Sequence, residues 1–252
     1  MGIPRILVLG GTTEARELAE RLAERPEFDT IVSLAGRTES PRALPVPTRV
    51  GGFGGAEGLA DYLVDEKIDL LIDATHPFAN QISANAEKAA VLTDVPMFSL
   101  CRPGWQQRPD DRWLQIASVA EAVAALGPIP RRLFLSIGRQ EAYQFSAAPQ
   151  HAYVVRSVDP VEPPLAVPDC RYILATGPFT AKSERDLFLD NRIDTLVTKN
   201  SGGSATYGKI EAARALGIEV FMIERRTPPD VRTVHDAASA LDLIDHLLVP
   251  TK

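Results

Sequence analysis

The sequence predicts an α/β protein made of two similar Rossmann-like domains, with parallel sheets that flank a central cleft. Short apolar runs alternate with helical stretches, which is typical of parallel strands joined by right-handed crossovers. The pattern also occurs twice: an apolar run, a polar turn, a helix, a second apolar run and an Ala-rich helix fill residues 68–126 and again residues 193–248. We expect domains of residues 1–126 and 127–252, with a soft boundary because the last helix could pack on either.

In the first half, strands are expected where short runs are rich in aliphatic and β-branched side chains. These runs are residues 5–9, 30–34, 48–50, 69–72 and 97–100. Helices are expected after them, at about residues 13–25, then up to about 66, at 79–92 and at 120–126. Leu18 and Leu22, four residues apart, give the first helix an apolar face.

Residues 127–130, with the sequence GPIP, cannot continue a helix and are the expected linker. Strands of the second half are then expected at residues 132–136, 153–155, 172–175, 195–198 and 220–223, and helices at 207–216 and 237–248. The Pro-rich residues 158–168 predict an extended surface loop.

Composition narrows the class of protein. Hydrophobic residues make up 45% of the chain, as in an ordinary globular protein, and no apolar run approaches the roughly 20 residues that cross a bilayer. The two cysteines, Cys101 and Cys170, form neither a disulfide framework nor a zinc pattern with histidine. We therefore expect a cytoplasmic protein that binds neither a membrane nor a metal.

The charge is distributed unevenly. The net charge is -6, with 12 basic and 18 acidic residues in residues 1–126 but 15 of each in residues 127–252. The second half is therefore the more favourable for an anionic ligand. Nucleic acid is not expected as a partner, because the sequence has no long basic stripe for phosphate contacts.

The turn after the first strand reads Gly10, Gly11, Thr12, Thr13 and Glu14. Glycines let a ligand approach the backbone, and the N-terminus of the next helix attracts a pyrophosphate. The later glycines of the G-x-G-x-x-G fingerprint are missing, so a tight turn with a threonine N-cap is the alternative.

Two further strand ends extend this candidate cofactor site. Arg37 and Thr38 follow the second strand, where a basic residue suits the 2′-phosphate of NADP; the alternative is a solvated arginine. Residues 51–55 contain Gly52 and three other glycines, which leave room for a flat ligand or form a flexible connection.

The loop after the strand at 69–72 contains Thr75, His76 and Phe78. These side chains are expected beside the nicotinamide. His76 could donate a hydrogen bond, act as an acid or cap the next helix, and Phe78 could pack on a ring or begin the core of its helix.

The loop after the strand at 195–198 predicts an anion site. It contains Lys199, Asn200, Ser201, Gly202 and Gly203, and the next helix directs its N-terminus to the same place. A capped loop with a solvated lysine is the alternative. Other cations near strand ends, which would suit several carboxylates or form ordinary surface charges, are Arg139, Arg156 and Lys182.

Three segments together resemble the precorrin-6A reductase family of cobalamin biosynthesis: residues 10–14 (GGTTE), 73–79 (DATHPFA) and 198–203 (TKNSGG). The resemblance spans nearly the whole chain. It implies NADPH-dependent reduction of one double bond in a tetrapyrrole, precorrin-6A to precorrin-6B, and neighbouring pathway enzymes as partners.

On this reading NADPH contacts the first domain and the acetate and propionate arms contact Arg139 and residues 199–203, with Lys199 and His76 as candidate proton donors. Two alternatives remain: a non-catalytic two-lobed binder of small molecules or nucleotides, and another enzyme such as a different NADP-dependent reductase or a tetrapyrrole synthase. A short-chain reductase would show Tyr-x-x-x-Lys, whereas Tyr207 and Lys209 are two apart.

Overall fold

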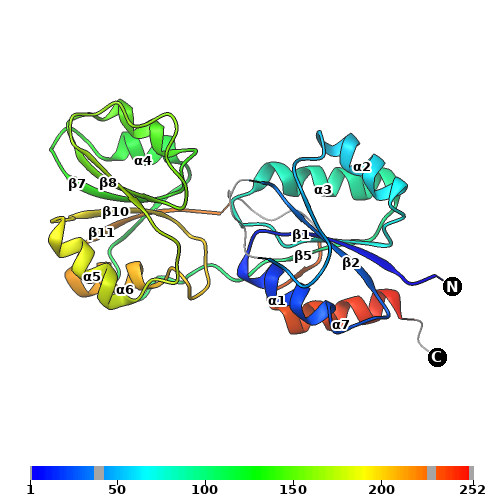
Figure 1. Ribbon diagram of the computed structural model, residues 1–252. Coiled ribbons are helices and arrows are strands. Elements are labelled where there is room, and N and C mark those ends of the chain that lie inside the picture. Colours follow the sequence, from blue (N-terminus) through cyan, green and yellow to red (C-terminus); the bar gives the residue numbers. More distant parts are fainter. Residues whose placement is uncertain (1, 37–42, 226–230, 250–252) are drawn as a thin grey trace. The chain divides into compact units, whose positions relative to one another are not determined.

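The computed structural model describes residues 2–36, 43–225 and 231–249. The chain forms two compact α/β units, one of Met1–Pro103 with Arg226–Lys252 and one of Gly104–Arg225 (Figure 1). Each unit contains a six-stranded sheet in which every paired strand runs parallel to its neighbour. The expected class, two Rossmann-like units with parallel sheets, is confirmed.

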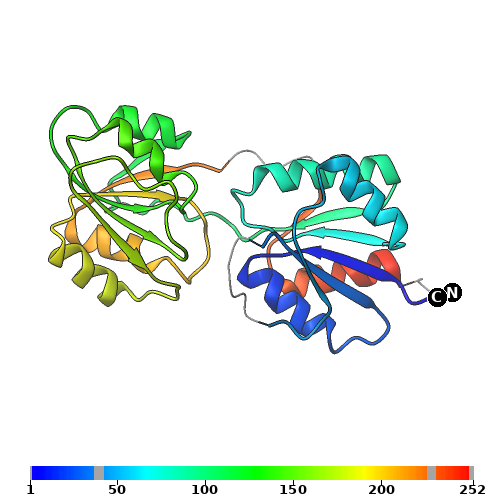
Figure 2. The same ribbon diagram turned by 45° about the horizontal axis from the view of Figure 1, so that its top comes forward.

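The first sheet has the order β12-β5-β4-β1-β2-β3. Its elements are β1 (Arg5–Leu9), α1 (Thr13–Leu22), β2 (Asp29–Leu34), β3 (Thr48–Val50), α2 (Ala56–Asp65), β4 (Leu70–Asp73), α3 (Asn80–Thr93), β5 (Met97–Leu100), β12 (Thr233–Val234) and α7 (Ala237–Leu248). Along β1, Ile6 and Val8 pack with α1 and α7, whereas Leu7 and Leu9 pack with α2 and α3. Figure 2 shows these two pairs of helices on opposite faces of the sheet. Both faces are covered, which is why the strands read as continuous apolar runs.

The second sheet has the order β6-β11-β10-β7-β8-β9. Its elements are β6 (Trp113–Ile116), α4 (Val119–Ala125), β7 (Arg132–Ser136), the 3₁₀ helix η1 (Ala142–Ala147), β8 (Ala152–Ser157), β9 (Cys170–Leu174), α5 (Ala181–Asp190), β10 (Thr195–Lys199), α6 (Gly208–Leu216) and β11 (Glu219–Ile223). Phe134, Phe188, Leu196 and Ile210 belong to one core cluster, so α5 and α6 cover one face of this sheet.

Each sheet takes its sixth strand from the other half of the sequence. β6 pairs with β11, with Trp113 opposite Val220, and β12 pairs with β5, with Thr233 opposite Ser99. The compact units therefore differ from the expected ones. The chain enters the second unit after Pro103 and returns after Arg225, and α7 packs on α1 in the first unit. Residues 127–130, expected as the linker, join α4 to β7 inside the second unit.

The uneven distribution of charge persists with these unit boundaries. Residues 104–225 contain 14 basic and 14 acidic residues, so the whole net charge of -6 belongs to the first unit. Among the helices that the structure describes, none is long and apolar enough to span a bilayer.

Candidate functional site

In a parallel sheet the carboxyl ends of the strands share one edge, and ligands of open α/β folds bind there. In the first unit, the loops after β1, β4 and β5 lie at this edge. In the second unit, the loops after β7, β10 and β11 lie at the corresponding edge. In the described part of the chain, the residues expected to bind ligands follow strands that end at these two edges. Gly52 follows β3.

The turn after β1 requires glycine at two positions. The amide of Gly10 donates to the carbonyl of Ser33 at 2.9 Å, and a Cβ on Gly10 would lie 2.9 Å from Cγ1 of Val32. Gly11 has φ +126°, a conformation that side chains rarely adopt, and a Cβ there would meet no atom of the described residues within 4 Å. The backbone at Gly11 is therefore open to a ligand.

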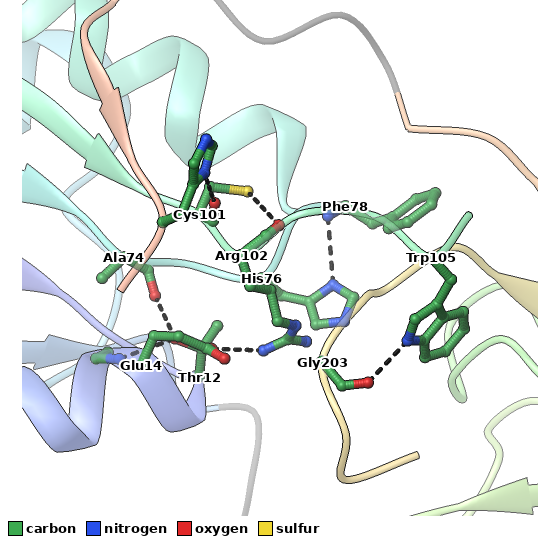
Figure 3. A network of polar contacts seen from close by, with 11 residues as sticks. Thr12, Glu14, Ala74, His76, Phe78, Cys101, Arg102, Trp105 and Gly203 are labelled. Atoms are coloured by element: carbon green, nitrogen blue, oxygen red, sulfur yellow. Dashed lines mark hydrogen bonds and ion pairs between the residues drawn. The ribbon is translucent and has the colours of Figure 1, made fainter. Parts of the chain in front are cut away.

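Thr12 is the N-cap of α1 and its hydroxyl is engaged by the protein (Figure 3). The hydroxyl accepts from the amide of Ala15 at 3.1 Å and donates to the carbonyl of Ala74 at 2.9 Å. The N-cap alternative therefore describes Thr12. The amides of Thr13 and Glu14 come before the first intrahelical hydrogen bond, which Arg16 donates. These two amides, at the positive end of α1, suit a pyrophosphate.

Arg102, two residues after the end of β5, contacts the candidate cofactor site and was not expected there from the sequence. Its guanidinium pairs with the carboxylate of Glu14 at 2.6 Å, and both side chains are less than one-fifth exposed (Figure 3). The pair neutralises a carboxylate that would otherwise repel a phosphate at the start of α1. A basic residue just after a strand was the signal used for Arg37, and the same signal marks Arg102.

The loop after β4 is ordered by its own polar groups. The hydroxyl of Thr75 donates to the buried carboxylate of Asp73 at 2.7 Å. Nδ1 of His76 accepts from the amide of Phe78 at 3.3 Å, and the two rings are 5.9 Å apart (Figure 3). His76 therefore shapes the turn before α3, and the acceptor role of Nδ1 places the proton of a neutral ring on Nε2.

Arg49 organises the glycine-rich loop after β3. Its guanidinium donates to the carbonyls of Gly51 at 3.0 Å and Gly52 at 3.2 Å and stacks 3.9 Å from the ring centroid of Phe53. The loop at Gly52 is thus held by several defined contacts. Arg37 and Thr38, expected to bind the 2′-phosphate, lie outside the described residues.

The second unit places Lys199 at the end of β10. Its ammonium forms an ion pair with Glu141, and the side chain is 15% exposed. The next residue, Asn200, is engaged on both ends of its amide: Oδ1 accepts from the amide of Trp105 at 2.7 Å and Nδ2 donates to the carbonyl of Trp105 at 3.1 Å. Asn200 therefore positions the loop.

Trp105 fixes the rest of this loop. Its indole Nε1 donates to the carbonyl of Gly203 at 2.7 Å (Figure 3), and Gly202 and Gly203 have φ +66° and +73°. Ser201 contacts the carbonyl of Lys199 at 3.5 Å. No local sequence pattern connects Trp105 with this loop, because Trp105 lies 95 residues before Asn200.

The other expected cations have different environments. Arg139 lies 3.8 Å from the carboxylate of Asp159 and remains partly exposed. Lys182 forms an exposed pair with Asp186. Arg156, expected at the strand end, is buried and pairs with Glu184, so it supports the core beneath the edge. Within the described residues, no group of three or more His, Cys, Asp or Glu side chains could hold a metal.

Comparison with known proteins identifies the family. The profile of the precorrin-6x reductase CbiJ/CobK family matches residues 5–245. The chain belongs to this family. It is 62% identical to a precorrin-6A reductase of Sinorhizobium sp over 98% of this chain and 95% of that protein, and 49% identical to the Rhodobacter capsulatus precorrin-6A reductase over 89% of each. The solved structure of a CobK precorrin-6A reductase matches with a TM-score of 0.92 and 45% identity over 97% of each chain.

The CbiJ/CobK match includes both edges described above, since residues 5–245 span the loops after β1, β4, β7 and β10. A reductase family with Rossmann-like units implies a nicotinamide cofactor, which supplies the hydride while the protein sets its position. The Gly10–Gly11 turn and the free amides of α1 fit the pyrophosphate of such a cofactor.

Proposed function

We propose that this protein is a precorrin-6A reductase of cobalamin biosynthesis that uses NADPH to reduce one double bond of the macrocycle and yields precorrin-6B. The observation that carries the proposal is whole-length similarity, with 62% identity over 98% of the chain to a protein of that name. We place the reaction in the cytoplasm.

The first unit is assigned to the cofactor. The amides of Thr13 and Glu14 would bind the pyrophosphate, and the open backbone of Gly11 lets it approach. The Arg102–Glu14 pair keeps the local charge near neutral. His76 holds the turn after β4, where we place the nicotinamide. These groups bind and orient the cofactor.

The second unit is assigned to the tetrapyrrole. Its formal charge is zero, against -6 for the first unit, so it repels a polycarboxylate less. Lys199 and Arg139 would bind carboxylate arms of the substrate, which would replace or join the carboxylates of Glu141 and Asp159 that they contact now. The hydroxyl of Ser201 and the backbone amides of Gly202 and Gly203 would provide further hydrogen-bond donors.

Lys199→Ala is expected to raise the KM for precorrin-6A by about 10-fold to 100-fold, because a hydrogen bond to a charged group contributes about 1.5–3 kcal/mol. The Kd for NADPH should stay within about twofold, since Lys199 lies in the other unit. Lys182→Ala, which removes an exposed lysine of the same unit, is the control and should leave both constants unchanged. Loss of NADPH affinity in Lys199→Ala would contradict the assignment of units.

Arg37→Ala tests the choice of NADPH over NADH. The variant should weaken NADPH binding by about 10-fold or more, because it removes a charge-assisted contact to the 2′-phosphate, and should barely change NADH binding. Fluorescence titration with each cofactor measures the difference. Equal effects on the two cofactors would remove the role of Arg37.

The reaction itself is tested by mixing the protein anaerobically with NADPH and precorrin-6A and following the absorbance of the reduced nicotinamide. One cofactor should be oxidised per macrocycle, and the mass of the tetrapyrrole should increase by two hydrogens. Tight NADPH binding without any oxidation would instead favour a non-catalytic binding protein.

A further inference from the structure

The second unit contains a buried lysine to which the proposed function assigns no task. Lys209 lies in the first turn of α6 and is 3% exposed. Its Nζ is 3.2 Å from the hydroxyl oxygen of Ser136 and 5.2 Å from the ring centroid of Trp105. The same tryptophan holds Gly203, so Lys209 lies directly beneath the loop assigned to the substrate.

The surroundings of Lys209 make its ammonium unusually acidic. Within residues 2–36, 43–225 and 231–249, no carboxylate lies within ion-pair distance of Nζ. The charged groups that act on it are Arg156 on β8 and Glu184 on α5, which pair with each other. Burial, reinforced by Arg156 and opposed by Glu184, lowers the pKa of Lys209 to about 7. The side chain can therefore exchange a proton near neutral pH.

Ser136 connects this lysine to the edge of the sheet. It is the last residue of β7, it is half-buried, and it pairs with Thr198, the residue before Lys199. Phe134, two residues earlier and thus on the same face, packs in the cluster that contains Ile210 of α6. The hydroxyl of Ser136 therefore lies between α6 and the carboxyl edge.

We propose that Ser136 and Lys209 form a proton relay for the reduction, with Ser136 as the catalytic residue that donates to the macrocycle and Lys209 as the positioning residue that reprotonates Ser136. The inference rests on the proposed function. One carbon of the reduced double bond receives the hydride that the cofactor supplies. The π electron pair forms the second C–H bond with the proton from Oγ of Ser136, Nζ of Lys209 returns a proton to Oγ, and water restores the ammonium.

The acidity of Lys209 can be tested without turnover. Heteronuclear NMR of the side-chain amines of the whole protein should show one lysine that titrates near pH 7, and this signal should be missing in Lys209→Met. Ser136→Ala should retain the titrating lysine. If every lysine titrates near the ordinary pKa of about 10.4, the relay is overturned.

Kinetics test the relay itself. Ser136→Ala should lower kcat by about 100-fold or more with little change in KM, because general acid catalysis contributes about 10²–10⁴-fold. Ser136→Thr, which keeps the hydroxyl, should recover much of the rate. Ser146→Ala is the matched control, since Ser146 is a half-buried serine of the same unit whose hydroxyl accepts from the amide of Ala166 instead.

The pH profile separates a relay from a structural role. A donor must hold its proton, so kcat/KM should be level below about pH 7 and fall above it, and this fall should disappear in Ser136→Ala. A wild-type kcat in Ser136→Ala, a retained fall with pH, or a change confined to KM would each overturn the relay. Absence of turnover in the wild-type protein would instead remove the proposed function, and the relay with it.

Discussion

Gly11→Val is expected to weaken NADPH binding by about 100-fold or more while precorrin-6A binding stays within about twofold. Gly11 has φ +126°, which costs a side chain about 1–3 kcal/mol. A Cβ there meets no atom of the described residues within 4 Å, so the side chain would project into the space assigned to the pyrophosphate. The expected loss of NADPH affinity follows from two lost hydrogen bonds between the charged pyrophosphate and the amides of α1, because each contributes about 1.5–3 kcal/mol.

Gly127→Val is the matched control for this prediction. Gly127 also has a positive φ, +70°, and open space around its Cβ, but it lies between α4 and β7 in the second unit. A side chain at Gly127 is therefore strained as well, and Gly127 belongs to the second unit, so its substitution should leave NADPH affinity unchanged. Fluorescence titration with NADPH measures both variants. Wild-type affinity in Gly11→Val would place the pyrophosphate elsewhere.

Glu184→Ala is expected to lower the free energy of unfolding by about 3–5 kcal/mol, because it leaves the buried guanidinium of Arg156 without its partner. The two side chains are 2% and 6% exposed, and Nη2 of Arg156 donates to Glu184 at 2.8 Å. The guanidinium also stacks 3.6 Å from the ring centroid of Phe179. Denaturant unfolding monitored by circular dichroism measures the change.

Asp186→Ala in the same helix is the control for this prediction. Asp186 pairs with Lys182 at the surface, and such an exposed i,i+4 contact contributes little to stability. The double variant Arg156→Met with Glu184→Leu should regain most of the lost stability, because replacement of both buried charges by apolar groups is often neutral. Equal losses of unfolding free energy in Glu184→Ala and Asp186→Ala would mean that the buried Arg156–Glu184 pair contributes no more to stability than the exposed pair.

Local sequence pattern predicted most strands and helices, because strands buried on both faces must be apolar runs. It did not predict β6 or β12. Gln115 interrupts β6, and β12 is two residues long, so neither has a distinctive local pattern. Their exchange between sheets depends on pairings with distant strands. The segment at residues 127–130 illustrates the same limit, because proline and glycine mark a turn within a unit as readily as a linker.

For the candidate site, too, the sequence predicted some features and missed others. The loops that hold Gly11, His76 and Lys199 were found because they follow strands, and strand ends are visible in the sequence. The long-range partners in the second unit were not found, since those contacts join segments that are far apart in the sequence. Lys199 meets Glu141 across 58 residues, and Lys209 meets Ser136 across 73.

The most direct test of the whole account is a crystal structure of the protein grown with NADP⁺. We predict density for the pyrophosphate against the amides of Thr13 and Glu14, beside the open backbone of Gly11, and for the 2′-phosphate beside Arg37. Density for the dinucleotide at the loop of Lys199 in the second unit, with the Gly10–Gly11 turn empty, would contradict the account.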